Sequence, residues 1–134
     1  MIEIQPVQHI DAAIEVPGSK SLTQRALIAA SLAKGTSTLS GPLESDDTRY
    51  SSEALMQMGI AMDKGKKWVI HGKAGLIKSS REPIFLGNNG TATRFLTSVA
   101  ALGNGNFLID GDARMHQRPI GPLMAPLRGW GVDI

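Results

Sequence analysis

The chain has 134 residues, of which 42% are hydrophobic and 19% are charged, a composition typical of one globular domain rather than of a disordered segment. The net charge of +2 is too balanced for a dedicated nucleic-acid-binding protein, and the absence of cysteine excludes disulfides and thiolate metal sites. Because the sequence has neither a run of about 20 apolar residues nor the apolar core of a signal peptide, we expect a cytoplasmic protein without a membrane partner.

In the first half of the chain, the sequence predicts short strands that alternate with two helices. Residues 2–7 and 12–16 have the composition of strands, and a Pro-Gly-Ser break follows at 17–19. One helix is predicted over 21–34 with Ser19 as its N-cap, and a second helix is predicted from a cap at 45–47 to about residue 58. Further strands are predicted at 36–40, 59–62, 68–71 and 84–86.

The stretch LGNNGTATRFL, residues 86–96, joins the end of an apolar strand to a second apolar run. Asn89-Gly90 also favours a β-hairpin turn, but the apolar residues that follow recur at helical spacing. We therefore predict a glycine loop and a helix from about Thr91, with Arg94 one turn into the helix. A helix start of this kind favours a phosphate or carboxylate ligand, and an ordinary strand–helix turn is the alternative.

An internal repeat relates two parts of the chain. RALIAASLAKGTSTLSG from Arg25 and RFLTSVAALGNGNFLIDG from Arg94 share the order arginine, apolar helix, glycine and strand, and another helix follows each. Such a repeat indicates two copies of one supersecondary unit. The first copy continues well beyond Gly59, whereas the second stops at Ile134, so we expect this sequence to be part of a longer chain.

The equivalent stretch of the first copy, PGSKSLTQR, also places basic residues at a helix start. Ser21 and Arg25 are four residues apart and share one helix face, and Lys20 adds a mobile charge at the mouth of the helix. The stretch resembles the tail of a Walker A loop, but Ser19 and Ile14 stand where that motif needs glycine, so we expect no nucleoside triphosphate site. Solvated surface charge is the alternative for these residues.

A third basic stretch, ARMHQRPIG, places Arg114 and Arg118 in a loop before a helix predicted to begin at Pro119. The adjacent carboxylates of Asp46 and Asp47 suit acid–base chemistry, but their place before a helix favours capping.

Together these stretches resemble one family, the 3-phosphoshikimate 1-carboxyvinyltransferases or EPSP synthases. Its members carry PGSKS-x-x-x-R, LGN-x-GT-x-x-R and R-M-x-x-RPIG in this order, and the chain has all three at 17–25, 86–94 and 114–121. The resemblance covers essentially the whole chain.

The resemblance implies an α+β fold (α/β sandwich) of repeated βαβαββ units. Residues 17–86 would form the first unit, and 87–134 would form a second unit that is incomplete here. Residues 1–16 would form strands that pair with a missing second domain.

The family transfers the enolpyruvyl group of phosphoenolpyruvate to the 5-hydroxyl of shikimate 3-phosphate, a step of the shikimate pathway to aromatic amino acids, without a metal or organic cofactor. By motif position, Lys20, Ser21 and Arg25 would bind shikimate 3-phosphate. Lys20 would also lie between the two substrates, as the catalytic candidate of this chain.

By motif position in the same family, Lys20, Gly90 and Arg118 would bind phosphoenolpyruvate. Three further residues would support their loop, namely Asn88, Thr91 and Arg94. The acidic residue for proton transfer would lie beyond position 134, which makes the C-terminal part of the enzyme a necessary partner. Asn89 stands where bacterial members usually have alanine, and we expect its larger side chain to narrow the phosphoenolpyruvate pocket or to add a hydrogen bond there.

Two alternatives stay open. The sister transferase that acts on UDP-N-acetylglucosamine shares the fold, but its first motif differs from PGSKS. A noncatalytic RNA- or phosphate-binding module could use the same βαβαββ units, although the chain is poor in the aromatic residues that RNA binding favours.

Overall fold

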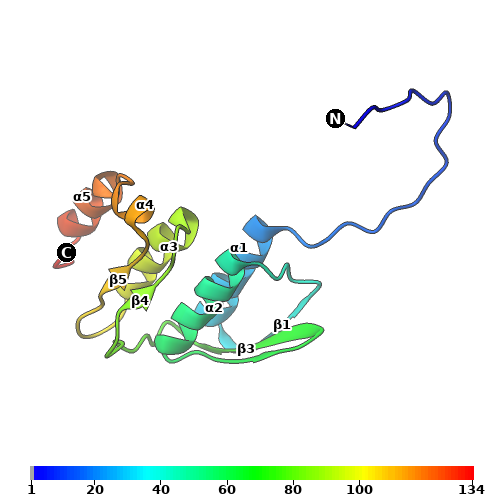
Figure 1. Ribbon diagram of the computed structural model, residues 1–134. Helices are drawn as coiled ribbons and strands as arrows, with labels where there is room; N and C mark the ends of the chain where they lie inside the picture. Colours follow the sequence, from blue (N-terminus) through cyan, green and yellow to red (C-terminus); the bar gives the residue numbers. More distant parts are fainter. Residues whose placement is uncertain (1) are drawn as a thin grey trace.

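Helices and strands alternate from residue 20 onwards in the computed structural model, which describes residues 2–134 (Figure 1). The fold is of the α+β type that the sequence predicts. None of the helices within residues 2–134 has the length and hydropathy that a membrane crossing requires. In chain order the elements are α1 (Lys20–Leu32), β1 (Lys34–Ser40), α2 (Asp46–Gln57), β2 (Ala61–Lys64), β3 (Lys67–Lys73), β4 (Ile84–Phe85), α3 (Gly90–Ala100), β5 (Ile109–Asp110), α4 (Ala113–His116) and α5 (Gly121–Gly129).

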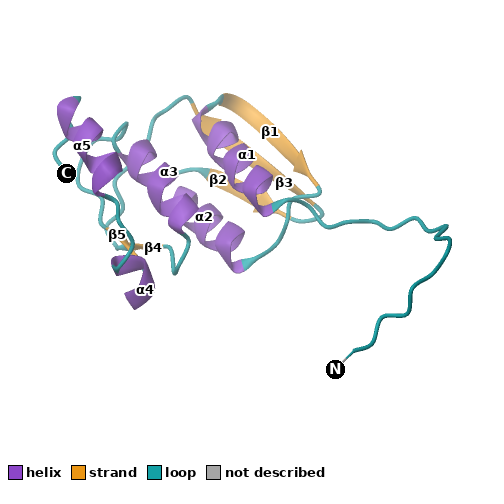
Figure 2. Ribbon diagram, turned by 90° about the horizontal axis from the view of Figure 1, so that it is seen from above, coloured by secondary structure: helices purple, strands orange, loops and turns teal. Residues whose placement is uncertain are grey.

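The larger sheet has the strand order β1-β3-β2, and β3 is antiparallel to both neighbours. Side chains alternate along β3, so that Trp68 and Ile70 are buried while Lys67 and Lys73 are exposed. Helix α1 packs on β3 and against α2, and α2 in turn contacts α3. Figure 2 shows α1 lying across this sheet and α2 between α1 and α3. The three helices therefore form a row, in which α1 and α2 contact the larger sheet and α3 contacts α2.

Gly72 allows the C-terminal end of α1 to approach β3 closely. A Cβ atom at this position would lie 2.2 Å from the carbonyl oxygen of Ala33 and 2.4 Å from that of Ala30. Since both atoms belong to the backbone, neither can swing aside to accommodate a side chain. Glycine is therefore required sterically where β3 passes under the end of α1.

The second half of the chain begins with a β–α–β unit. Strand β4 is parallel to β5, with Ile84 opposite Ile109, and α3 forms the crossover that a parallel pair needs. Ile84, Leu86 and Leu96 are completely buried. They belong to the same hydrophobic core as the buried residues of α1, α2 and β3, so the two halves share one core.

The N-terminal segment differs from the prediction. Residues 2–16 contain no strand, and they extend away from the rest of the chain (Figure 1). Their large apolar side chains are 65–92% exposed. The strands predicted at 2–7 and 12–16 do not form because a strand needs hydrogen bonds from a neighbouring strand, and none of the described strands pairs with this segment. Met1 lies outside the described residues, and pairing with a second domain stays a prediction.

Two further differences lie in the second half. The stretch with Arg114, predicted to be a loop, contains the short helix α4, whose N-cap Asp112 accepts a hydrogen bond from the N–H of Met115 at 2.8 Å. The next helix begins at Gly121 rather than at Pro119. The order helix–strand–helix nevertheless recurs, as α1–β1–α2 and as α3–β5–α5 with α4 inserted. The boundary between two units at residue 86 stays a prediction.

Candidate functional site

Helix α1 begins at the junction between the extended N-terminal segment and the loop after β1. The hydroxyl of Ser19, the N-cap, accepts a hydrogen bond from the N–H of Leu22 at 3.4 Å. Gly18 makes the junction possible, because a Cβ there would lie 2.3 Å from the carbonyl oxygen of Gly41. The first turn, which opens with Lys20, carries backbone N–H groups without intrahelical partners and the positive end of the helix dipole. This end of the helix therefore favours an anion.

An ion pair joins the N-termini of α1 and α2. Lys20 Nζ lies 2.5 Å from Asp47 Oδ2, and 52% and 29% of these two side chains are exposed. An ion pair that is this accessible to water contributes at most about 1 kcal/mol to stability, so its main effect is to fix the ammonium group in place. Sequence analysis missed this role of Asp47 because its partner lies 27 residues away, beyond the reach of any local motif. Of the capping candidates at 45–47, Ser45 is the N-cap.

Ser21 and Arg25 share one exposed face of α1, as their spacing predicts. Arg25 Nη1 donates a hydrogen bond to the carbonyl oxygen of Ser21 at 3.0 Å. Its guanidinium carbon lies 5.3 Å from the ring centroid of Phe95 in α3, within the range of a cation–π contact. Arg25 therefore reaches from α1 towards α3.

Gly90, Arg94 and Arg118 meet at the N-terminus of α3. Arg94 donates from Nη1 to the carbonyl oxygen of Gly90 and from Nη2 to that of Pro119, each at 2.9 Å. A Cβ atom at Gly90 would lie 2.5 Å from Arg118 Nη1 and 3.1 Å from Arg94 Nη1. The structure thus brings together two guanidinium groups, from α3 and from the loop before α5, over one buried glycine.

Asn88 and Thr91 flank this arrangement. Asn88 is half-buried, and its Oδ1 is one of two buried side-chain polar atoms in residues 2–134 without a hydrogen-bond partner, the other being Trp68 Nε1. A buried acceptor without a partner is uncommon and costs free energy. Thr91, the second residue of α3, is exposed.

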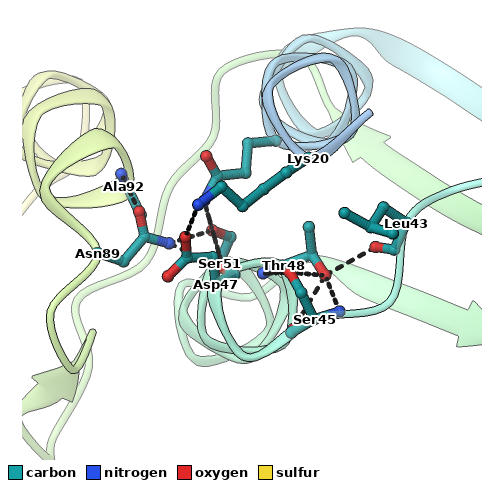
Figure 3. Close-up of polar contacts among 9 residues, drawn as sticks. Lys20, Leu43, Ser45, Asp47, Thr48, Ser51, Asn89 and Ala92 are labelled. Atoms are coloured by element: carbon teal, nitrogen blue, oxygen red, sulfur yellow. Dashed lines mark hydrogen bonds and ion pairs between the residues drawn. The ribbon is translucent and has the colours of Figure 1, made fainter. Parts of the chain in front are cut away.

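The prediction for Asn89 is wrong. Its side chain is 3% exposed and caps α3, because Oδ1 accepts a hydrogen bond from the N–H of Ala92 at 2.9 Å. Its Nδ2 donates to the carbonyl oxygen of Asp47 at 2.8 Å. Figure 3 shows the side chain directed towards α2. Asn89 therefore neither narrows a pocket beside Gly90 nor directs a free hydrogen-bonding group there.

A cavity of about 170 Å³ lies beside the two arginines and is lined in part by Arg94, Arg118, His116 and Asp110. His116 Nε2 lies 2.7 Å from Asp110 Oδ1, at the end of β5. The hydrogen bond with His116, followed by one from the N–H of Gly111, holds the pKa of Asp110 below its ordinary value. Among the described residues, this carboxylate is paired with His116 and forms no ion pair with Arg94 or Arg118.

The candidate site residues form two cationic clusters. One lies on α1 and comprises Lys20, Ser21 and Arg25, and the other comprises Gly90, Arg94 and Arg118. Asp47 and Asn89 join them, because Asp47 contacts Lys20 through its carboxylate and Asn89 through its carbonyl oxygen (Figure 3). Cationic side chains beside two helix N-termini can hold two anions.

Comparison with known proteins gives one consistent result. Residues 4–134 match the family model of EPSP synthase (3-phosphoshikimate 1-carboxyvinyltransferase). Enzymes with the latter name from Rhizobium etli and Pseudomonas syringae are 50% and 47% identical to this chain over 98% and 99% of its length. The structure of EPSP synthase from Acinetobacter baumannii matches 90% of the chain with a TM-score of 0.85 and 29% identity. The chain spans 31% of the Rhizobium relative, 32% of the Pseudomonas relative and 28% of the Acinetobacter chain.

Proposed function

We propose that this chain, which belongs to the EPSP synthase family, supplies part of a site that transfers the enolpyruvyl group of phosphoenolpyruvate to the 5-hydroxyl of shikimate 3-phosphate. The observation that carries the proposal is the meeting of Arg94 and Arg118 over Gly90 at one helix N-terminus, beside a second helix N-terminus that opens with Lys20. Both substrates are anions, and two adjacent cationic helix starts suit a pair of anions.

Shikimate 3-phosphate is assigned to the α1 cluster. Arg25 offers a planar fork of N–H groups that matches a phosphate, and Ser21 offers a hydroxyl on the same face. Lys20 lies on the side of α1 that faces Asp47 and Asn89, which supports its assignment between the two substrates.

Phosphoenolpyruvate is assigned to the α3 cluster. The N-terminus of α3 at Gly90 and the Arg118 guanidinium would hold its phosphate or carboxylate, while Arg94 holds the loop through its bonds to Gly90 and Pro119. The buried Oδ1 of Asn88 and the exposed Thr91 hydroxyl lie at the same loop.

The transfer requires protonation of the methylene carbon of phosphoenolpyruvate and deprotonation of the 5-hydroxyl. Lys20, whose ammonium group is held by Asp47, is the candidate in this chain for stabilising or moving charge between the substrates. We assign the acidic partner for proton transfer to the remaining, C-terminal part of the enzyme, since this chain spans 31% of the Rhizobium relative. The cytoplasmic location expected from the sequence stays a prediction.

The proposal is tested by NMR titration of the purified chain, a method that detects weak binding. We expect shikimate 3-phosphate to shift amide signals at the start of α1, and single-stranded RNA to leave them unchanged. Arg25→Ala should weaken binding by about 1 kcal/mol or more, the scale of a hydrogen bond to a charged group. Because Arg25 is exposed, the melting temperature should change little.

Arg49→Ala is the matched control, since Arg49 is also an exposed helical arginine but pairs with Asp46 and Glu53 on the surface of α2. Equal loss of affinity in both variants would show a nonspecific charge effect. Binding of RNA in place of shikimate 3-phosphate would support the RNA-binding alternative.

A further inference from the structure

Three buried polar side chains meet where α1, α2 and α3 begin. Gln24 of α1 and Ser51 of α2 are each 1% exposed, and Asn89, the N-cap of α3, is 3% exposed. Both amides donate to Ser51 Oγ, Gln24 Nε2 at 3.2 Å and Asn89 Nδ2 at 3.3 Å. All three side chains also donate to the carbonyl oxygen of Asp47, at 3.4, 2.7 and 2.8 Å for Gln24, Ser51 and Asn89. We call these three side chains and this carbonyl group the helix-start network.

The helix-start network is inaccessible to a ligand, because its three side chains are buried and their hydrogen-bonding groups are directed at one another. Burying so many polar atoms costs free energy unless each atom has a well-aligned hydrogen-bond partner. The network therefore tolerates only a narrow range of helix positions. Its members therefore affect a ligand only through the backbone that they hold.

The backbone that they hold belongs to both cationic clusters. Gln24 directly precedes Arg25, and Asn89 directly precedes Gly90. The carboxylate of Asp47, whose carbonyl oxygen belongs to the network, pairs with Lys20. Figure 3 shows Lys20, Asp47, Ser51 and Asn89 in this arrangement. A shift of any network member would thus change the distance between the start of α1 and the start of α3.

We infer that Asn89 and Ser51 are positioning residues, which fix the start of α3 relative to the start of α1. They thereby align the α3 cluster with Lys20. The inference rests on the proposed function. It depends on geometry, because two reactants gain from proximity only when both are held at the required separation and orientation.

The test compares Ser51→Ala with the matched control Ser52→Ala. Both residues of α2 are buried serines whose hydroxyls donate to α2 carbonyl groups, but Ser52 accepts from Lys64 rather than from Gln24 and Asn89. We expect both variants to lose stability. Only Ser51→Ala should weaken phosphoenolpyruvate binding to the purified chain, by about fivefold, the equilibrium effect of an ordinary hydrogen bond.

Asn89→Ser separates capping from bridging. Serine is a good N-cap, so much of the stability lost in Asn89→Ala should return, but serine is too short to bond Asp47 in α2. We therefore expect Asn89→Ser to bind phosphoenolpyruvate as weakly as Asn89→Ala. Recovery of affinity together with stability would reduce Asn89 to a helix cap and overturn the inference.

A ligand-free measurement keeps this test separate from that of the proposed function. In the amide NMR spectrum, Ser51→Ala should shift the signals of Gly90 and Lys20, whereas Ser52→Ala should leave them in place. If the unmutated chain does not bind phosphoenolpyruvate even after addition of the C-terminal portion, the proposed function fails, while shifts in Ser51→Ala would still support the coupling between helix starts. Unshifted signals in Ser51→Ala would overturn the coupling whether or not the ligand binds.

Discussion

Gly90 leaves room for a guanidinium group that any larger residue would displace. In Gly90→Ala the new Cβ would lie 2.5 Å from Arg118 Nη1. Because that atom is at the far end of a flexible side chain, Arg118 should move and the fold should persist. We expect affinity for phosphoenolpyruvate to fall by about tenfold, the scale of one hydrogen bond to a charged group, while the melting temperature changes little.

The control is Gly121→Ala, because a Cβ at Gly121 meets no atom within 4 Å. NMR titration with phosphoenolpyruvate and thermal unfolding should be run on both variants. Unchanged affinity in Gly90→Ala would mean that Arg118 does not contribute to binding from this position.

His116 lowers the pKa of Asp110. Their hydrogen bond is the largest cause of the lowered pKa of Asp110, so His116→Ala should raise this pKa towards the ordinary carboxylate value of about 3.9. A carboxylate with a lowered pKa stabilises the fold above its unfolded-state pKa, and this contribution is lost as the pH falls through the folded-state pKa. The unfolding free energy of His116→Ala should therefore depend less on pH below about 4.

Carbon NMR of the Asp110 carboxyl group during an acid titration measures this pKa directly. His71→Ala is the control, since His71 lies 3.6 Å from a different carboxylate, that of Asp63. A pKa of Asp110 that is the same with and without His116 would contradict the assignment.

At the scale of elements, the starts of α1, α2 and α3 were predictable because their signals are local. Ser19 and Ser45 cap α1 and α2 within three residues of sequence, and the glycine loop before α3 contains its cap, Asn89. Helix α4 was missed because four residues are too few to show a helical period. The predicted N-terminal strands failed for the opposite reason, since local composition favours a strand but only a distant segment can pair with it.

The same distinction between local sequence signals and distant contacts applies to the candidate site. Motif order pointed to Gly90, Arg94 and Arg118 as neighbours, and the structure brings them together. Asp47 and the inward direction of Asn89 could not be predicted, because each depends on how α2 packs between α1 and α3.

The start of α2 offers a direct test of a capping box. The Ser45 hydroxyl accepts from the N–H of Thr48, and the Thr48 hydroxyl accepts from the N–H of Ser45 at 3.0 Å. Ser45→Ala should lower the free energy of unfolding by about 1 kcal/mol, as loss of an N-cap usually does. Chemical denaturation measures this change, and the exposed Ser40 at the end of β1 supplies the control variant Ser40→Ala. An equal loss in the two variants would contradict the capping role.

At the scale of the whole molecule, this chain alone should not catalyse the transfer. It spans 31% of the length of its Rhizobium relative, and neither cationic cluster described above contains an acidic side chain that could carry a proton. Transition-state stabilisation needs groups fixed around the whole substrate. We expect no phosphate release from the two substrates with the chain alone, and measurable release after addition of the remaining C-terminal portion.

Phosphate release by the chain alone, at a rate comparable to that of a complete relative, would contradict this expectation. No release after addition of the C-terminal portion, with the mixture shown to form a complex, would argue against the proposed reaction itself.

Gly72 is a steric requirement that lies far from the candidate anion-binding residues. Helix α1 has 13 residues, so its start lies about 20 Å from the end that rests on β3. A side chain at position 72 would push against the carbonyl groups of Ala30 and Ala33, and a stiff helix would carry that displacement as a tilt to Lys20 and Arg25. Position 72 therefore has little mutational tolerance although it lies at the opposite end of α1 from Lys20, and a variant there would be mistaken for a binding-site mutation in any screen that records affinity alone.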